Sequence, residues 1–177
     1  MKGRPGRGDT LPLTDQTSPP SGPVALLARA LAFMGGVALL VAGAVTTISV
    51  LLRWTTNHPI RGDFEIVSIA AGIGVLGFLA YGTLMRTNIL VDSFTTWLPA
   101  RVNGVLDAFW MLIWVAVAAW IAERMLVGTL DTLASGTRTI GLLAIPYWWA
   151  IGIGALCFAA TALAGLWWLP RLLGLRS

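Results

Sequence analysis

Four long stretches with almost no charged residues constrain the fold of this chain more than any other feature. Residues 30–52, 66–85 and 139–170 contain no Asp, Glu, Lys or Arg, and residues 102–122 contain only Asp107. About 20 apolar residues in a helix, rising 1.5 Å each, cross a hydrocarbon core of about 30 Å. The sequence therefore predicts an all-α integral membrane protein with four transmembrane helices.

The expected spans are about residues 30–52, 66–85, 102–122 and 146–169. The fourth is placed from Pro146, because proline suits the first turn of a helix. Tryptophans flank this span, with Trp148 and Trp149 at its start and Trp167 and Trp168 at its end. Such positions are typical of the aromatic belts at the two membrane interfaces.

Composition supports a membrane protein and argues against a soluble or nucleic-acid-binding one. Hydrophobic residues make up 56% of the 177 residues and charged residues 11%, whereas soluble domains carry about 25% charged residues. The net charge is +4, but the basic residues are scattered singly at the edges of apolar runs. A nucleic-acid-binding protein would instead gather them on one face.

Residues 1–22 are rich in Gly, Pro, Ser and Thr, and we expect them to form a disordered cytoplasmic tail. Residues 23–177 then form the four-helix transmembrane domain. The apolar run after the tail is too long for a typical cleaved signal sequence, which favours an uncleaved first helix.

The distribution of basic residues predicts that both termini are cytoplasmic. In this orientation four basic residues lie outside: Arg53, Arg61, Arg124 and Arg138. Eight lie inside: Lys2, Arg4, Arg7, Arg29, Arg86, Arg101, Arg171 and Arg176. The excess follows the positive-inside rule. The connections from 53 to 65 and from 123 to 138 would face outward, and the one from 86 to 101 inward.

The expected spans contain no catalytic, cofactor or metal site. Asp107 is the ionisable residue closest to the middle of a span, and its place near the span end favours a structural or interfacial role. The only histidine, His58, falls in the first outer connection and has no partner for haem ligation. The chain has neither an HExxH pair nor a glycine-rich phosphate loop.

Two charges at the outer end of the first two spans could form a pair. Arg53 ends the first span and Glu65 begins the second, with the turn residues Pro59 and Gly62 between them. A salt bridge that holds this hairpin and two separately solvated helix caps are both compatible with the sequence. Small residues four apart, such as Ala70 and Gly74, favour helices that pack closely against other helices.

Three short motifs, in order along the chain, carry a family resemblance. The first runs over the first hairpin: Arg53, Pro59, Gly62 and Glu65. The second lies in the inner connection: Ile89, Val91, Asp92, Leu98, Pro99 and Arg101. The third precedes the fourth span: Ser135, Leu142, Ile145, Pro146 and Trp148. Together, over about residues 30–168, they resemble the DctQ-type small membrane subunits of tripartite ATP-independent periplasmic (TRAP) transporters. Asn88 departs from the pattern, because many members have a histidine there.

The resemblance implies a non-catalytic scaffold subunit in the bacterial inner membrane. Its partners would be a large multi-span membrane subunit, which holds the substrate and coupling sodium, and a periplasmic substrate-binding protein. The transported substrate would be an organic acid. Two other interpretations remain open: a stand-alone homo-oligomeric transporter or channel, and a membrane anchor for an enzyme complex.

Overall fold

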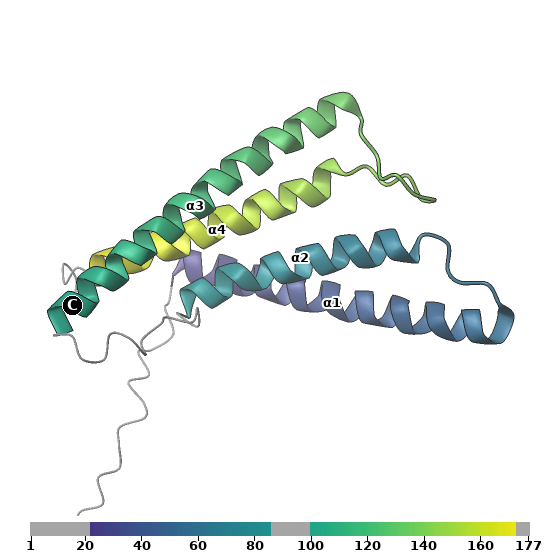
Figure 1. Cartoon of the computed structure of the whole chain (residues 1–177), viewed down its shortest axis with the longest axis horizontal. Helices are drawn as coiled ribbons and strands as arrows, with labels where there is room; N and C mark the ends of the chain where they lie inside the picture. Colours follow the sequence, from purple (N-terminus) through teal and green to yellow (C-terminus); the bar gives the residue numbers. More distant parts are fainter. Residues whose placement is uncertain (1–21, 86–99, 173–177) are drawn as a thin grey trace, which may run out of the picture.

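The computed structural model describes residues 22–85 and 100–172, which form four α-helices. The helices are α1 (Pro23–Thr56), α2 (Asp63–Leu84), α3 (Ala100–Ser135) and α4 (Trp148–Leu172). They form two helical hairpins, α1–α2 and α3–α4 (Figure 1). All four are long and apolar enough to cross a membrane. The prediction of an all-helical chain with four such helices is confirmed.

Local signals explain where the first two helices begin and end. Pro23 opens α1, where its missing N–H leaves no helical hydrogen bond unmade. After Thr56 the chain turns through Asn57, which adopts a left-handed conformation and donates its N–H to the Arg53 carbonyl at 3.1 Å. Gly62 precedes α2, and Asp63 and Glu65 lie in its first turn, where carboxylates complement the helix dipole.

Several helix ends differ from the ends of the expected membrane spans. α1 begins at Pro23, well before residue 30, and α4 begins at Trp148, two residues after Pro146. The largest difference is in α3, which continues beyond Ala122 to Ser135. Gly136, with φ of 64°, then ends the helix in a left-handed conformation. Glu123 and Arg124 are therefore helical residues and not part of a connection.

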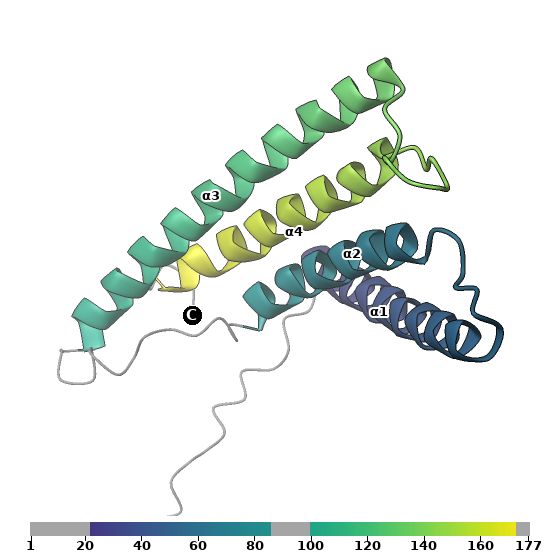
Figure 2. The same ribbon diagram turned by 45° about the vertical axis from the view of Figure 1, so that its right-hand side comes forward.

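The four helices lie in the spatial order α3, α4, α2, α1, and α4 is central. α4 packs against α3 and α2 and more sparsely against α1, whereas α3 packs closely against α4 alone among the described helices. Two views show the α3–α4 hairpin inclined to the α1–α2 hairpin (Figures 1 and 2). This open arrangement leaves much of α1, α2 and α3 uncovered.

The buried core joins the two hairpins near the end where α1 begins and α4 ends. Its members are small or aliphatic side chains: Ala25, Ala28, Leu31, Ala80, Leu84, Cys157, Ala160 and Ala164. Trp168 donates from Nε1 to the Leu84 carbonyl at 2.9 Å, and Trp114 donates to the Thr83 hydroxyl at 3.2 Å. The Trp168 bond satisfies a carbonyl at the end of α2 that has no helical partner.

Close backbone contact holds α1 to α2. A Cβ at Gly35 would lie 2.9 Å from the Gly74 carbonyl oxygen, and one at Gly77 would lie 2.5 Å from the Leu31 carbonyl oxygen. No side chain larger than hydrogen fits between the two backbones there. The small-residue spacing that includes Gly74 thus lies in a real helix contact.

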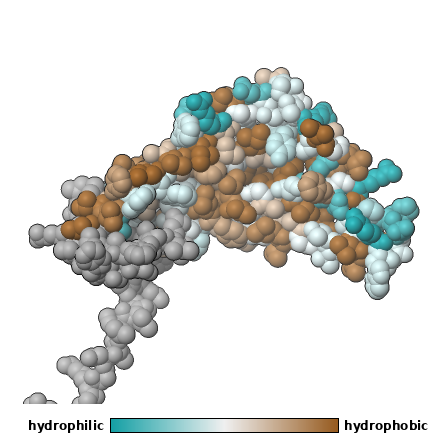
Figure 3. All heavy atoms as spheres, in the orientation of Figure 1, coloured by the Kyte–Doolittle hydropathy of each residue, from teal (hydrophilic) through white to brown (hydrophobic). Residues whose placement is uncertain are grey.

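Much of the surface is apolar, as expected for helices in lipid or against another membrane subunit. Figure 3 shows apolar surface along the helices and hydrophilic residues gathered near the interhelical loops, with a further hydrophilic patch partway along α3. Many large apolar side chains are exposed, including Phe33, Leu40, Trp120 and Leu130. A face this apolar marks an interaction surface for lipid or protein.

Candidate functional site

The most organised polar region lies where the α3–α4 loop, residues 136–147, meets the start of α2. Within the loop, the Thr139 N–H donates to the Ile145 carbonyl at 2.9 Å, and the Ile145 N–H donates to the Thr139 hydroxyl at 2.9 Å. Arg138 and Pro146 form an antiparallel bridge. These bonds give the loop a defined shape although it contains no helix.

Glu65 anchors this loop to α2. Its side chain is only 9% exposed, and its carboxylate accepts a hydrogen bond from the Thr139 hydroxyl at 2.9 Å and one from the Leu143 N–H at 3.3 Å. Gly141 passes so close that a Cβ there would overlap the Glu65 carboxylate. A buried carboxylate needs such donors, because burial without them is costly.

Gly62 supplies a second contact between the same two regions. It is buried, and its φ of 76° is a conformation that side-chain-bearing residues rarely adopt. The Leu143 side chain fills the space where a Cβ at Gly62 would lie. Leu143 therefore contacts α2 through its backbone at Glu65 and through its side chain at Gly62.

A hydrogen bond between Ser49 and Asp63 closes the α1–α2 hairpin at the same end. The Ser49 hydroxyl donates to the Asp63 carboxylate, which also accepts the Phe64 N–H at 2.7 Å. Ser49 is buried, so the bond satisfies a hydroxyl that is removed from water. We call the residues that make these contacts the loop-end junction. Its members are Ser49, Gly62, Asp63, Glu65, Thr139 and Leu143.

The structure separates the residues predicted for the first hairpin. Arg53 and Pro59 are exposed, whereas Gly62 and Glu65 are buried in the junction. The Glu65 carboxylate turns toward the α3–α4 loop, and Arg53 acts electrostatically on Asp63. The arrangement therefore does not favour the hypothetical Arg53–Glu65 salt bridge.

The other predicted residues lie apart from the junction or at its edge. Asp107 is half-buried in the second turn of α3, far along the chain from the loop. Pro146 is exposed within the loop, and Trp148 is 42% exposed at the first position of α4. Arg101 belongs to α3, but its side chain lies outside the described part, as do Asp92 and Pro99.

Sequence reasoning missed Ser49, Asp63, Thr139 and Leu143. Glu65 and Thr139 are 74 residues apart, and no periodicity in the sequence relates them. Asp63 could have been recognised as an acid in the first turn of a helix. Its partner Ser49 lies inside an apolar run, where serine gives no distinguishing signal.

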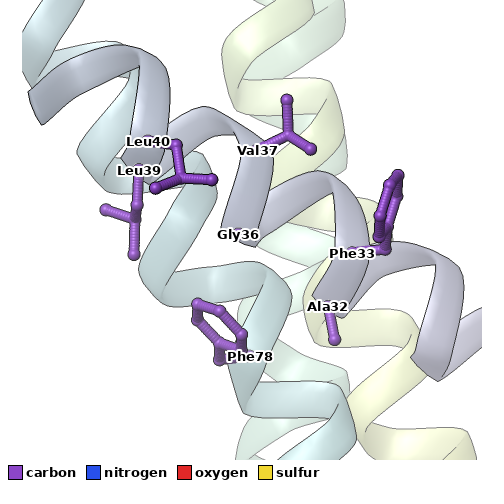
Figure 4. Close-up of a pocket in the computed structure, with 7 residues that line it drawn as sticks. All are labelled: Ala32, Phe33, Gly36, Val37, Leu39, Leu40 and Phe78. Atoms are coloured by element: carbon purple, nitrogen blue, oxygen red, sulfur yellow. The ribbon is translucent and has the colours of Figure 1, made fainter. Parts of the chain in front are cut away.

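The described residues offer little for catalysis or metal binding. They contain no group of three His, Cys, Asp or Glu side chains able to hold a metal ion. Cys157 is buried within the core. A groove of about 560 Å³ on α1 and α2 is lined by apolar side chains and Gly36 (Figure 4). Such a groove suits an acyl chain or an apolar side chain and provides no reactive group.

Comparison with known protein families identifies the chain. Residues 42–173, about three quarters of its length, match the model of the DctQ component of tripartite ATP-independent periplasmic transporters. The chain belongs to this family. Comparison with curated proteins and with solved structures found no match. The DctQ protein is therefore a multi-pass subunit of a periplasmic transport system and not an enzyme.

The matched region begins within α1 and ends just beyond α4. It contains the whole of α2, α3 and α4, and every member of the loop-end junction. The first half of α1, which supplies Ala25, Ala28 and Leu31 to the core, precedes the match. The junction thus lies in the part of the chain that is related to the family.

Proposed function

We propose that this DctQ protein is the non-catalytic scaffold subunit of a TRAP transporter in the bacterial inner membrane. It supports a large membrane subunit and a periplasmic binding protein during sodium-coupled uptake of an organic acid. The family match over residues 42–173 carries this proposal. The open helix arrangement supports it, because uncovered apolar faces are suited to packing against another membrane subunit.

The loop-end junction suits the side of the membrane from which substrate arrives. Ile140 is fully exposed in the α3–α4 loop, and Leu142 is 78% exposed. Glu65 and Gly62 hold the base of this loop, so that its exposed apolar residues occupy a defined position. In the proposed orientation, this loop faces the periplasm and contacts the binding protein.

Purification and transport assays test the scaffold role. The tagged DctQ protein is expressed with its proposed large membrane subunit and purified in mild detergent, and the complex is reconstituted with the binding protein in vesicles under a sodium gradient. We expect the large subunit to copurify and uptake to require all three proteins. Vesicles with the large subunit and the binding protein alone, matched for the amount of large subunit, are the control.

Three results would contradict the proposal. Full uptake without the DctQ protein would show that transport needs no scaffold of this kind. A pure homo-oligomer that moves substrate by itself would favour the stand-alone transporter. A cofactor spectrum in the purified complex would instead favour the enzyme-anchor alternative.

A further inference from the structure

Two adjacent charged residues, Glu123 and Arg124, lie on the exposed surface of α3 well before its end. Both side chains are exposed, and α3 continues after them for eleven residues to Ser135. Large exposed apolar side chains lie on either side of them, including Trp120, Leu126 and Val127. Figure 3 shows a hydrophilic patch partway along α3, beside the apolar surface nearer the start of the helix.

The packing of α3 against α4 gives the depth of these charges. α4 carries no charged residue from Trp148 to Pro170, a length of about 35 Å at 1.5 Å per residue, which is enough to cross the hydrocarbon core. The Met125 side chain fills the space beside Gly154, and Val115 fills the space beside Gly165. These two contacts place α3 and α4 in antiparallel register.

In this register Arg124 is level with about residue 156 of α4, well inside that helix. Its backbone lies about 12 Å from the level of Trp148, counting eight residues along the helix. Trp148 begins the aromatic pair expected at the membrane interface. A long basic side chain near a helix end extends its charge to the interface, but Arg124 is too far from the end of α4 for this. The sequence analysis ended the third span at Ala122 and therefore placed Glu123 and Arg124 outside the membrane.

The Arg124 side chain also faces away from α4. The α3 residues buried against α4 include Val115 and Ala118, with Met125 continuing that stripe. Residues three or four apart share a face of a helix, so Arg124 shares its face with Trp120 and Val127. These neighbours are 61% and 44% exposed. At this level, α4 is the only described helix packed against α3.

Glu123 lies next to Arg124 in α3 but on a different face of the helix. Adjacent residues on a helix point in directions about 100° apart and do not face each other. An ionised side chain at this depth that meets lipid is unfavourable, and such residues usually face protein or a polar cavity. The Arg124 face therefore needs a covering group that offers both apolar contact and a hydrogen-bond acceptor.

We propose that a transmembrane helix of the large membrane subunit covers the α3 face formed by Trp120, Arg124 and Val127. Its apolar side chains pack on Trp120 and Val127, and it supplies a carboxylate or carbonyl acceptor to the Arg124 guanidinium. Charge complementarity selects this occupant over lipid tails, which offer no acceptor. The inference rests on the proposed function and extends it by locating the interface between the two membrane subunits.

Substitution of Arg124 distinguishes a protein interface from a lipid-facing surface. In the tagged complex, Arg124→Leu should reduce the copurified large subunit by about tenfold or more, because it leaves the partner's buried acceptor without its charge. Arg124→Lys should retain more of the complex, since it keeps the charge. Arg138→Leu, which removes an exposed arginine in the α3–α4 loop, is the matched control and should leave the yield unchanged. Equal or higher yield with Arg124→Leu would overturn the inference, because leucine suits a lipid-facing position.

Photo-crosslinking tests the same face without removing a charge. Val127→Cys in a Cys157→Ala background is labelled with a photoactivatable maleimide and irradiated in the assembled complex. A crosslink to the large subunit is expected. Crosslinks only to lipid or to a second copy of this chain would overturn the inference while leaving the proposed function intact. If the unmodified protein fails to copurify with the large subunit, the proposed function itself fails.

Discussion

Glu65 has the surroundings of a structural carboxylate, with donors from a loop that lies far away in the sequence. Glu65→Gln removes the charge that strengthens the bonds from Thr139 and Leu143, and Thr139→Ala removes one donor. We expect each change to lower the free energy of unfolding by about 1–3 kcal/mol. The measurement is thermal unfolding of the purified protein in detergent.

A double-mutant cycle with Glu65→Gln and Thr139→Ala isolates the contribution of this pair. Because the residues are in direct contact, the effects should be non-additive by about 0.5–3 kcal/mol. Thr55→Ala is the matched control, since the Thr55 hydroxyl is exposed and donates to carbonyl groups of its own helix. Strictly additive losses would show that the bond does not couple α2 to the loop.

Replacement of Gly62 and of Gly128 by alanine should have opposite effects on the stability of the protein. Gly62→Ala places a side chain in a left-handed conformation and against Leu143, so it should destabilise the protein by about 1–2 kcal/mol or more. Gly128 lies in α3 with nothing near its Cβ position, and Gly128→Ala should stabilise the helix by up to about 1 kcal/mol. The same unfolding assay compares them. Equal shifts in Tm would contradict the assigned role of Gly62.

At the scale of the elements, the α1–α2 hairpin depends on close backbone approach. Gly77→Ala would put a methyl group 2.5 Å from the Leu31 carbonyl oxygen, so the helices must move apart. We expect a loss of about 1–3 kcal/mol, as for other overpacked sites. Gly72→Ala in the same helix meets no neighbour and is the control. A stability unchanged by Gly77→Ala would show that the two helices are not in this contact.

The positions of the helices could largely be predicted from the sequence, because an apolar run of hydrocarbon length without charge is typical of a membrane span. The end of α3 could not be predicted in this way. Glu123 and Arg124 end the charge-free run, but both residue types favour helix, and only Gly136 stops it. Charged residues indicate where a sequence leaves the hydrocarbon core of the membrane, whereas the conformational preference of each residue determines where the helix ends. The two criteria differ here by thirteen residues.

Only Gly62 and Glu65 of the candidate site could be predicted from the sequence. Gly62 and Glu65 belong to a recognisable motif in a short connection, where turn residues and helix caps have sequence signals. The partners of Glu65 come from an irregular loop whose shape depends on its own hydrogen bonds. Such a loop has no periodicity, so nothing in the sequence placed Thr139 beside Glu65.

At the scale of the whole molecule, the two hairpins are staggered. The core joins Ala25, Ala28 and Leu31 of α1 to Cys157, Ala160 and Ala164 of α4. Beyond Leu31, α1 continues for 25 residues to Thr56. From Cys157 in that core, α4 reaches back only nine residues to Trp148. The loop end of α1 therefore extends beyond α4, as Figure 1 shows. The α3–α4 loop reaches across to α2 and joins the hairpins at this end through Glu65.

The orientation of the whole chain gives the last prediction. Ile140 is fully exposed at the loop end, and the native Cys157 is only 1% exposed. The test uses cells in which the outer membrane has been permeabilised and the inner membrane is intact. In these cells a membrane-impermeant maleimide should label Ile140→Cys and leave the unsubstituted protein unlabelled. Ser18→Cys, in the expected cytoplasmic tail, should react only after the inner membrane is opened, because eight of the twelve basic residues favour the cytoplasmic side for the termini. The reverse labelling pattern would place the loop-end junction in the cytoplasm, where it could not meet a periplasmic binding protein.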